Sequence, residues 1–249
     1  MSPTKDFLHA TQRFSRHPFP LRRGELIKTQ NVYLTILHNG VLTMKFNIAE
    51  MDWKELHDLL SGAMVPRPIA LVSTVGEDGV FNLAPFSRWG LLSVKPPIVY
   101  VAVGAKIRAR QKKDTIKNIE FSKDFVINVV DEALAEPMNQ SSADYPSEVD
   151  EFKEVGLKAV ESNLVKAPRV AESPINMECR LRQIMQFGEF PESTDVAIGE
   201  ILRVHVRDYL WVNNAIQMSK LKAIGKLGGE LYCRTPDIFE MKRPYILGQ

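Results

Sequence analysis

The hydrophobic and polar positions of this chain alternate with a period of two over much of its length, which predicts strands rather than long helices. The longest alternating stretches are Ile175–Phe187 and Val196–Val206. Four shorter runs, rich in apolar and β-branched residues, indicate further strands at Ile69–Val75, Val80–Leu83, Ile98–Val103 and Phe125–Val130. At least six strands with hairpin-like connections favour a mainly β protein with peripheral helices. A closed or partly closed antiparallel barrel fits this pattern better than a doubly wound parallel sheet.

Helices and turns are predicted at few places. A helix over Asp52–Leu60 has Gly62 as a stop just past its end, and Asp114 or Thr115 can cap a second helix that runs to Ser122. The polar stretch 131–163 reads as helical in two pieces, Ala133–Met138 and Val149–Val155, outside the sheet. The sequence Gly76-Glu77-Asp78-Gly79 is a strong hairpin-turn signal between two strands.

The first 43 residues differ from the rest of the chain. They hold six basic side chains against two acidic ones, and Asn31–His38 predicts one strand that ends at the turn Asn39-Gly40. Three interpretations stay open: a poorly ordered extension, an organelle-targeting peptide, or a non-native stretch before a functional start at Met44. We therefore divide the chain into an extension, residues 1–43, and one domain, residues 44–249.

Composition excludes several classes of protein. With 249 residues, 45% of them hydrophobic and 25% charged, the chain is typical of a globular domain with a sizeable core. A net charge of only +2, gathered at the N-terminus, argues against nucleic-acid binding. Two cysteines, Cys179 and Cys233, give neither a disulfide framework nor metal-ligand spacing. Without a membrane-spanning or secretory segment, we expect a soluble, cytoplasmic protein with no metal.

Three polar clusters lie between Pro66 and Asn118, where predicted strands end or a helix begins. They read Pro66-Arg67-Pro68-Ile69-Ala70-Leu71-Val72-Ser73-Thr74, then Asn82-Leu83-Ala84-Pro85-Phe86-Ser87, then Lys113-Asp114-Thr115-Ile116-Lys117-Asn118. Such positions leave backbone N–H groups free to meet an anion, so the clusters predict a cradle for a phosphorylated cofactor. Neither a G-x-G-x-x-G dinucleotide motif nor a P-loop is present, so the phosphate must be bound in another way.

The order and spacing of these motifs resemble the flavin reductase-like family of FMN-binding split barrels, which includes flavoredoxins and small flavin reductase components. The resemblance extends from about Phe46 to Pro244 and includes Leu227-Gly228-Gly229 with Tyr232 and Arg234. It implies an antiparallel split barrel, FMN as cofactor, and a homodimer with the flavin near the subunit boundary. It also implies an oxidoreductase that passes electrons from NADH or NADPH through the flavin to an acceptor.

Two other functions stay open. In a flavoredoxin-type electron carrier, a redox partner protein reduces the bound FMN and no free substrate is turned over. In a third interpretation, the split barrel binds a different ligand. Flavin supplies the redox chemistry itself, so no side-chain acid or base is required, and the sequence identifies no catalytic residue.

The resemblance implies eleven cofactor-binding residues. For the phosphate we expect Lys113 and Thr115 at the helix start, completed by Ser87 and Arg67. For the ring and ribityl chain we expect the strand positions Ser73, Thr74, Asn82, Leu83 and Ala84, with Asn118 and His205 completing the set. Each residue also has a structural interpretation, such as a helix cap, a solvated lysine or a histidine that only fixes a strand. Trp89, Phe187 and Tyr232 are further candidates to stack on the ring.

Overall fold

The computed structural model describes residues 26–29, 32–36, 42–105, 111–235 and 237–244, and divides the chain into two compact units, residues 1–57 and 58–249. In the first unit, three antiparallel strands form a small sheet: β1 (Leu26–Thr29), β2 (Val32–Ile36) and β3 (Leu42–Phe46). The strand expected over Asn31–His38 corresponds to β2, whereas the Asn39-Gly40 turn lies outside the described residues. The division expected after residue 43 falls inside β3, because its pairing with β2 continues to Phe46.

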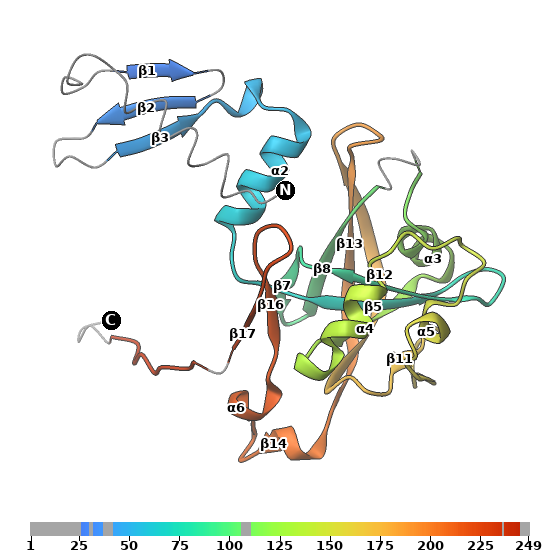
Figure 1. Ribbon diagram of the computed structural model, residues 1–249. Coiled ribbons are helices and arrows are strands. Elements are labelled where there is room, and N and C mark those ends of the chain that lie inside the picture. The colour runs from blue at the N-terminus through green and yellow to red at the C-terminus, as the bar shows by residue number, and fades with distance from the viewer. Residues whose placement is uncertain (1–25, 30–31, 37–41, 106–110, 236, 245–249) are drawn as a thin grey trace. The chain divides into compact units, whose positions relative to one another are not determined.

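The second unit is built on a seven-stranded antiparallel sheet in the order β6-β5-β9-β12-β13-β8-β7 (Figure 1). Its strands are β5 (Ala70–Val75), β6 (Phe81–Phe86), β7 (Trp89–Val94), β8 (Pro97–Gly104), β9 (Asp124–Val129), β12 (Ile175–Phe187) and β13 (Thr194–Val206). A second sheet has the order β17-β16-β4, with strands Tyr232–Arg234, Ile224–Lys226 and Arg67–Pro68. Two short pairs complete the set: β10 (Ala159–Val160) with β11 (Arg169–Val170), and β14 (Trp211–Val212) with β15 (Ala215–Ile216).

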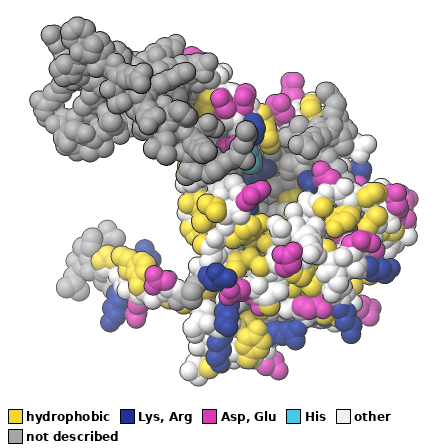
Figure 2. Space-filling model, in the orientation of Figure 1, with side chains coloured by type: hydrophobic (Ala, Val, Ile, Leu, Met, Phe, Trp, Pro, Cys, Tyr) yellow, Lys and Arg dark blue, Asp and Glu magenta, His cyan; other side chains and the backbone are white. Residues whose placement is uncertain are grey.

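The helices are short and lie between strands. They are η1 (Ile48–Glu50), α2 (Trp53–Ala63), α3 (Asp114–Ser122), η2 (Glu132–Leu134), α4 (Ala135–Gln140), α5 (Glu151–Glu154), η3 (Asp208–Leu210) and α6 (Met218–Leu221). No described helix has the length and apolar character that crossing a membrane requires. Acidic and basic side chains are both found on the face seen in Figure 2.

The seven-stranded sheet curls around one core. Phe86 of β6 and Val101 of β8, which belong to strands near opposite ends of the sheet, are buried in the same cluster. Ile116 and Ile119 of α3 are also part of it, so this helix closes one end of the curled sheet. The opposite face of β5 packs on α4 and α5 through a second cluster around Leu71. The fold is therefore a mainly β, split-barrel architecture, as expected from the alternating pattern.

One predicted helix end was wrong, and one strand of the large sheet was missed. Gly62 does not end a helix, because α2 continues through it to Ala63. Strand β7 was missed, because Leu91, Leu92 and Val94 are all exposed apolar residues at the edge of the sheet and give no inside-outside alternation. The Gly76–Gly79 hairpin turn is confirmed, and Gly79 has the positive φ of 80° that such turns need.

Replacing Gly199 with alanine is expected to lower the free energy of unfolding by about 1–3 kcal/mol. A Cβ atom on this β13 residue would lie 2.6 Å from Cζ of Phe125, whose ring is fully buried and has no room to move away. Urea denaturation measures the effect. Gly62→Ala is the matched control, since its Cβ would meet nothing within 4 Å and alanine favours helix. A Gly199→Ala variant as stable as the unmodified protein would contradict this packing.

Candidate functional site

Four of the predicted residues come together through the side chain of Asn82 on β6. Its Oδ1 accepts hydrogen bonds from the hydroxyls of Thr74 (3.2 Å) and Thr115 (3.0 Å), and Asn118 donates to the Thr74 hydroxyl at 3.1 Å. Thr74, Asn82 and Thr115 are buried. The alternation of β5 and β6 places Thr74 and Asn82 opposite each other, and α3 supplies the other two. We call these four residues the Asn82 cluster.

Glu151 at the start of α5 completes the buried polar network. Its carboxylate accepts hydrogen bonds from the Asn82 amide (2.7 Å) and from the Leu83 backbone N–H (3.0 Å). Burial raises the pKa of Glu151 above its ordinary value, the two hydrogen bonds act in the opposite direction, and Asp114 adds to the rise. Glu151 therefore holds the amide of Asn82 in one orientation, with its oxygen toward the two threonines.

Lys113 precedes the first turn of α3 and has the extended backbone of an N-cap residue, but no side chain caps the helix. The prediction that Asp114 or Thr115 caps α3 was thus wrong, because both belong to the first turn. The N–H groups of that turn lack intrahelical partners and favour an anion. The ammonium of Lys113 lies 3.2 Å from the carboxylate of Asp144, on a polar segment that faces the helix.

A cavity of about 50 Å³ lies between β6, the start of α3 and the segment 141–145. Asn82, Ala84, Lys113 and Thr115 line it, together with Glu151. A neighbouring cavity of about 430 Å³ shares Asn82 but is lined by Glu77, Asp78 and Asp114 with Lys117 as its one cation. The lining of each cavity holds three acidic residues and one lysine, and the smaller cavity has the Thr115 hydroxyl beside Lys113.

Arg67 and Ser87 form a second group beyond the other end of β6. The Arg67 guanidinium donates to the Ser87 hydroxyl (3.2 Å) and to the backbone oxygens of Ser61, Met64 (2.9 Å) and Leu227 (3.0 Å). Burial and the nearby charge of Arg67 lower the pKa of the neighbouring Arg88. No contact of the described residues joins Arg67 or Ser87 to the Asn82 cluster.

Ser73 and Leu83 face the other side of the sheet. The Ser73 hydroxyl donates to the backbone oxygen of Pro168 and accepts from the amide of Asn128 at 3.1 Å, in a fully buried position. The side chain of Leu83 lies in the hydrophobic cluster under α4 and α5, and its N–H is bonded to Glu151. Through these contacts Ser73 connects β5 to β9, and Leu83 connects β6 to α5.

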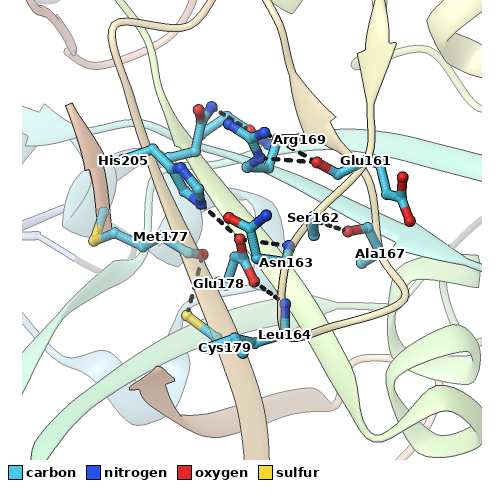
Figure 3. Close-up of polar contacts among 12 residues, drawn as sticks. Glu161, Ser162, Asn163, Leu164, Ala167, Arg169, Met177, Glu178, Cys179 and His205 are labelled. Atoms are coloured by element: carbon cyan, nitrogen blue, oxygen red, sulfur yellow. Dashed lines mark hydrogen bonds and ion pairs between the residues drawn. The ribbon is translucent and has the colours of Figure 1, made fainter. Parts of the chain in front are cut away.

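His205 points toward a buried carboxylate (Figure 3), and it is not among the residues that line the Lys113 cavity. Its Nε2 lies 2.6 Å from Oε1 of Glu178, a β12 residue with no exposed surface. Glu178 also accepts the backbone N–H groups of Asn163 (3.0 Å) and Leu164 (2.7 Å). Burial raises the pKa of Glu178, but the hydrogen bonds from Asn163, His205 and Leu164 outweigh it, so that the net shift is downward.

The aromatic candidates lie in different environments. Trp89 packs against the barrel core, and its buried indole N–H has no hydrogen-bond partner among the described residues. Phe187 is 56% exposed at the end of β12. Tyr232 lies under the ammonium of Lys226, 3.9 Å from the ring centre, and its hydroxyl is 3.4 Å from the Asn139 side chain. The Gly228-Gly229 pair forms the β16–β17 turn.

Sequence reasoning missed Glu151 and Asp144, which contact Asn82 and Lys113. Both lie in the stretch between β9 and β12, which the polar, proline-containing sequence places outside the sheet. The only signal for Glu151 was its position at the start of a short helix, where an acidic residue is expected in any case. A tertiary contact 69 positions away along the chain is not visible in such a local pattern.

Comparison with known proteins places this architecture in a family. Residues 61–217 match the family model described as flavin reductase like domain. An uncharacterised protein of Aquifex aeolicus is 36% identical over 193 residues, which are 77% of this chain and 96% of that protein. Nitrilotriacetate monooxygenase component B from Bacillus cereus superposes with a TM-score of 0.76 at 31% identity, over 80% of this chain and 98% of its own.

A second solved structure gives the same answer. The 2-nitrobenzoate 2-nitroreductase of Pseudomonas fluorescens superposes with a TM-score of 0.74 at 30% identity, over 82% of this chain and 98% of its own. The residues matched by the family model, 61–217, include the whole seven-stranded sheet and the Asn82 cluster. On these grounds the chain belongs to the flavin reductase-like domain family.

Proposed function

We propose that this protein is a flavoprotein oxidoreductase that binds FMN and passes electrons from NADH or NADPH to an acceptor. The observation that carries the proposal is the start of α3, where Lys113, the Thr115 hydroxyl and an uncapped helix terminus converge in a protein of this family. A dianionic phosphate is the group that a cation, a hydroxyl donor and free N–H groups recognise together.

Asp144 is paired with the lysine to which we assign the phosphate. Its carboxylate is the ionic partner of Lys113, and the cavity of about 50 Å³ beside them has no room for a flavin. The side chain of Asp144 is 61% exposed, so little holds it on the lysine. We infer that the phosphate of FMN replaces Asp144 on Lys113 and that the segment 141–145 withdraws to admit the rest of the molecule.

Ala84 and its neighbours on β6 suit the flat part of the cofactor. Ala84, Pro85 and Phe86 line the cavity next to Asn82, and the small Ala84 side chain leaves a surface that a planar ring can approach. Ser87 follows the far end of the same strand, where Arg67 of β4 donates to it, and both stay predicted contacts of the cofactor. Thr115, which Asn82 holds in place, would thus bind the phosphate end of FMN, and β6 would support the flavin ring.

The chemistry requires little of the protein beyond binding and orientation. Bound FMN supplies the redox chemistry, as the acceptor of a hydride from a reduced nicotinamide and the donor of electrons to the next acceptor. A nicotinamide that stacks on the exposed ring needs no dinucleotide-binding motif, which agrees with the absence of one from the sequence.

A homodimer is the second part of the proposal. Strand β7 is the last strand of the seven-stranded sheet, and its Leu91, Leu92 and Val94 are 59%, 57% and 77% exposed. Apolar side chains gathered on an edge strand favour association with a partner, because they are otherwise left in water. A second copy of this chain is the partner that the family resemblance implies.

The function is tested on the purified, full-length protein. A visible spectrum before and after adding FMN shows whether flavin binds, and NADH or NADPH is then added without oxygen. Prompt bleaching of the flavin is the expected result. A yellow protein that only a redox partner protein bleaches would support the electron carrier instead. A colourless protein that takes up no FMN would overturn both proposals.

Replacing Lys113 with methionine is expected to weaken FMN binding by about tenfold or more, because a charged hydrogen bond to the phosphate is lost. Calorimetric titration measures the affinity, and riboflavin, which has no phosphate, is titrated beside FMN. The loss should be absent for riboflavin. Lys117→Met on the same helix is the control, since Lys117 is paired with Asp114 and lies outside the 50 Å³ cavity. Equal losses for both flavins would place the phosphate elsewhere.

A further inference from the structure

We propose that residues 237–244 form an exchanged arm, which packs into a groove between α4 and the β16–β17 hairpin of a second copy of this chain. The proposal rests on the self-association included in the proposed function. It adds which segments of the two copies meet. Flavin binding is not needed for it, so the two can fail separately.

The arm is apolar and exposed. Ile238, Phe239 and Met241 are 55%, 79% and 81% exposed, the last two among the most exposed large hydrophobic side chains described. Residues 237–244 have no hydrogen bond with any described part of the chain. An extended segment of this length reaches up to about 26 Å. Such a segment leaves its apolar side chains in water unless another surface covers them.

The groove is a third cavity, with a volume of about 700 Å³. None of the eleven predicted cofactor-binding residues lines it, but Tyr232, a further candidate to stack on the ring, does. The buried side chains of Met138 and Ile224 lie at its base, with Ala135 beside them. Residues of η2 and α4 line one side of the groove, and residues of β16 and β17 line the other. Its volume is within the range of about 300–1,000 Å³ found for ligand pockets.

Two carboxylates of the groove have no cation beside them, although Glu136 accepts a hydrogen bond from the Gln140 side chain at 3.1 Å. Arg234 is paired with Glu132, and the ammonium of Lys226 lies over the ring of Tyr232. Glu136 and Glu230 also line the groove, and neither has an ion-pair partner among the described residues. The groove therefore offers an apolar base with two carboxylates that a basic segment can neutralise.

The sequence of the arm matches these features in order. Alternate side chains of an extended segment lie on the same side, so Phe239 and Met241 share one face. That face fits the base of the groove, and the basic pair Lys242-Arg243 directly after it fits Glu136 and Glu230. Met and aromatic side chains next to arginine are the residues enriched at protein interfaces.

The position at which the arm begins indicates that the arm of a second copy, rather than the chain's own arm, occupies the groove. Arg234 is itself part of the groove wall, and the hydroxyl of Thr235 is bonded to the backbone oxygen of Ala223 at 2.7 Å. The chain would have to reverse immediately after this anchor to enter its own groove. In a two-fold dimer, by contrast, two arms that start beside two grooves can cross reciprocally, so every contact is made twice.

Photo-crosslinking tests the exchange directly. Benzoylphenylalanine is incorporated at position 239 in a full-length chain labelled with ¹⁵N, which is mixed with unlabelled unmodified chain, dissociated and reassociated before irradiation. The expected result is mixed-isotope crosslinks from position 239 to residues 132–139 or 224–234. Crosslinks only within one isotope would show that the arm folds onto its own groove. Crosslinks elsewhere, or none, would also overturn the proposal.

A pair of point variants provides the second measurement. Phe239→Ser is expected to weaken the dimer by about a hundredfold or more, because both copies lose a buried aromatic side chain. Glu240→Ser, on the other face of the arm, should leave the dimer unchanged. Analytical ultracentrifugation gives the dissociation constants, and a visible spectrum with added FMN is recorded on the same samples. An unchanged dimer in Phe239→Ser overturns the exchange, whereas failure to bind FMN overturns only the flavin proposal.

Discussion

Replacing Glu178 with alanine is expected to lower the free energy of unfolding by about 3–5 kcal/mol, which is the usual loss when one partner of a buried charged network is removed. The carboxylate has no exposed surface and is bonded to the N–H groups of Asn163 and Leu164 and to the ring of His205. Alanine leaves these part-buried donors without their acceptor. Among surface substitutions, by comparison, changes of about 0.5 kcal/mol are ordinary.

Urea denaturation followed by circular dichroism measures this loss. Glu161→Ala is the matched control in the loop that holds Asn163 and Leu164, because the Glu161 side chain is exposed and only its backbone oxygen is bonded, to Arg169 (Figure 3). The control should retain the stability of the unmodified protein. If Glu178→Ala unfolds at the same urea concentration as the control, the network around His205 does not stabilise the fold.

The same carboxylate makes stability depend on pH in a defined direction. Because the pKa of Glu178 in the folded protein is lower than its ordinary value of 4.5, the ionised form stabilises the fold. The stabilisation is fully present above pH 4.5 and is lost as the pH falls through the lower, folded pKa. The difference in unfolding free energy between the unmodified protein and Glu178→Gln should therefore shrink on acidification.

The sequence predicted the strands that have one buried and one exposed face, or that are buried on both. Ile175–Phe187 was predicted with the bounds that the structure shows, and β13 begins two residues before its predicted start. Strand β7 was missed because its apolar side chains are exposed at the edge of the sheet and do not alternate with polar ones. Hydrophobic periodicity detects a strand when one of its faces is buried and the other is exposed, and an edge strand with exposed apolar side chains does not show this pattern.

The site was predicted in part for a similar reason. The motif order brought Thr74, Asn82, Thr115 and Asn118 to one cluster, and the hairpin pairing explains why the first two meet. Ser73 is the neighbour of Thr74 in β5, so its side chain faces the opposite side of the sheet, where it is bonded to Asn128. His205 was placed by strand alternation alone, which gives the face of a residue but not the partner it finds there.

Replacing Asn82 with alanine is the other change from which we expect a large effect, a loss of about 3–4 kcal/mol in unfolding free energy. The amide donates to the buried carboxylate of Glu151 and accepts the hydroxyls of Thr74 and Thr115, so three hydrogen bonds disappear at once. Without them the Thr115 hydroxyl is no longer fixed beside Lys113. FMN affinity should therefore fall by about tenfold or more in the same variant.

Thermal or urea unfolding and a titration with FMN measure the two effects of Asn82→Ala separately. Ser142→Ala is the control, because Ser142 lines the same cavity but is exposed and is bonded only to the backbone oxygen of Asn139. Unchanged FMN affinity in a destabilised Asn82→Ala protein would show that the cluster holds the fold without positioning the phosphate. Unchanged stability would contradict the network itself.

The pH dependence of Asn82→Ala gives an independent check through Glu151. Burial holds the pKa of Glu151 above its ordinary value of 4.5, so the neutral carboxyl is the form that favours the fold. Its contribution is fully present below pH 4.5 and is lost as the pH rises through the folded pKa. Asn82→Ala removes a hydrogen bond that stabilises the ionised form, which raises that pKa further. The stability lost by the variant should thus be larger at pH 7 than at pH 4, whereas equal losses at both would show that Glu151 does not depend on Asn82.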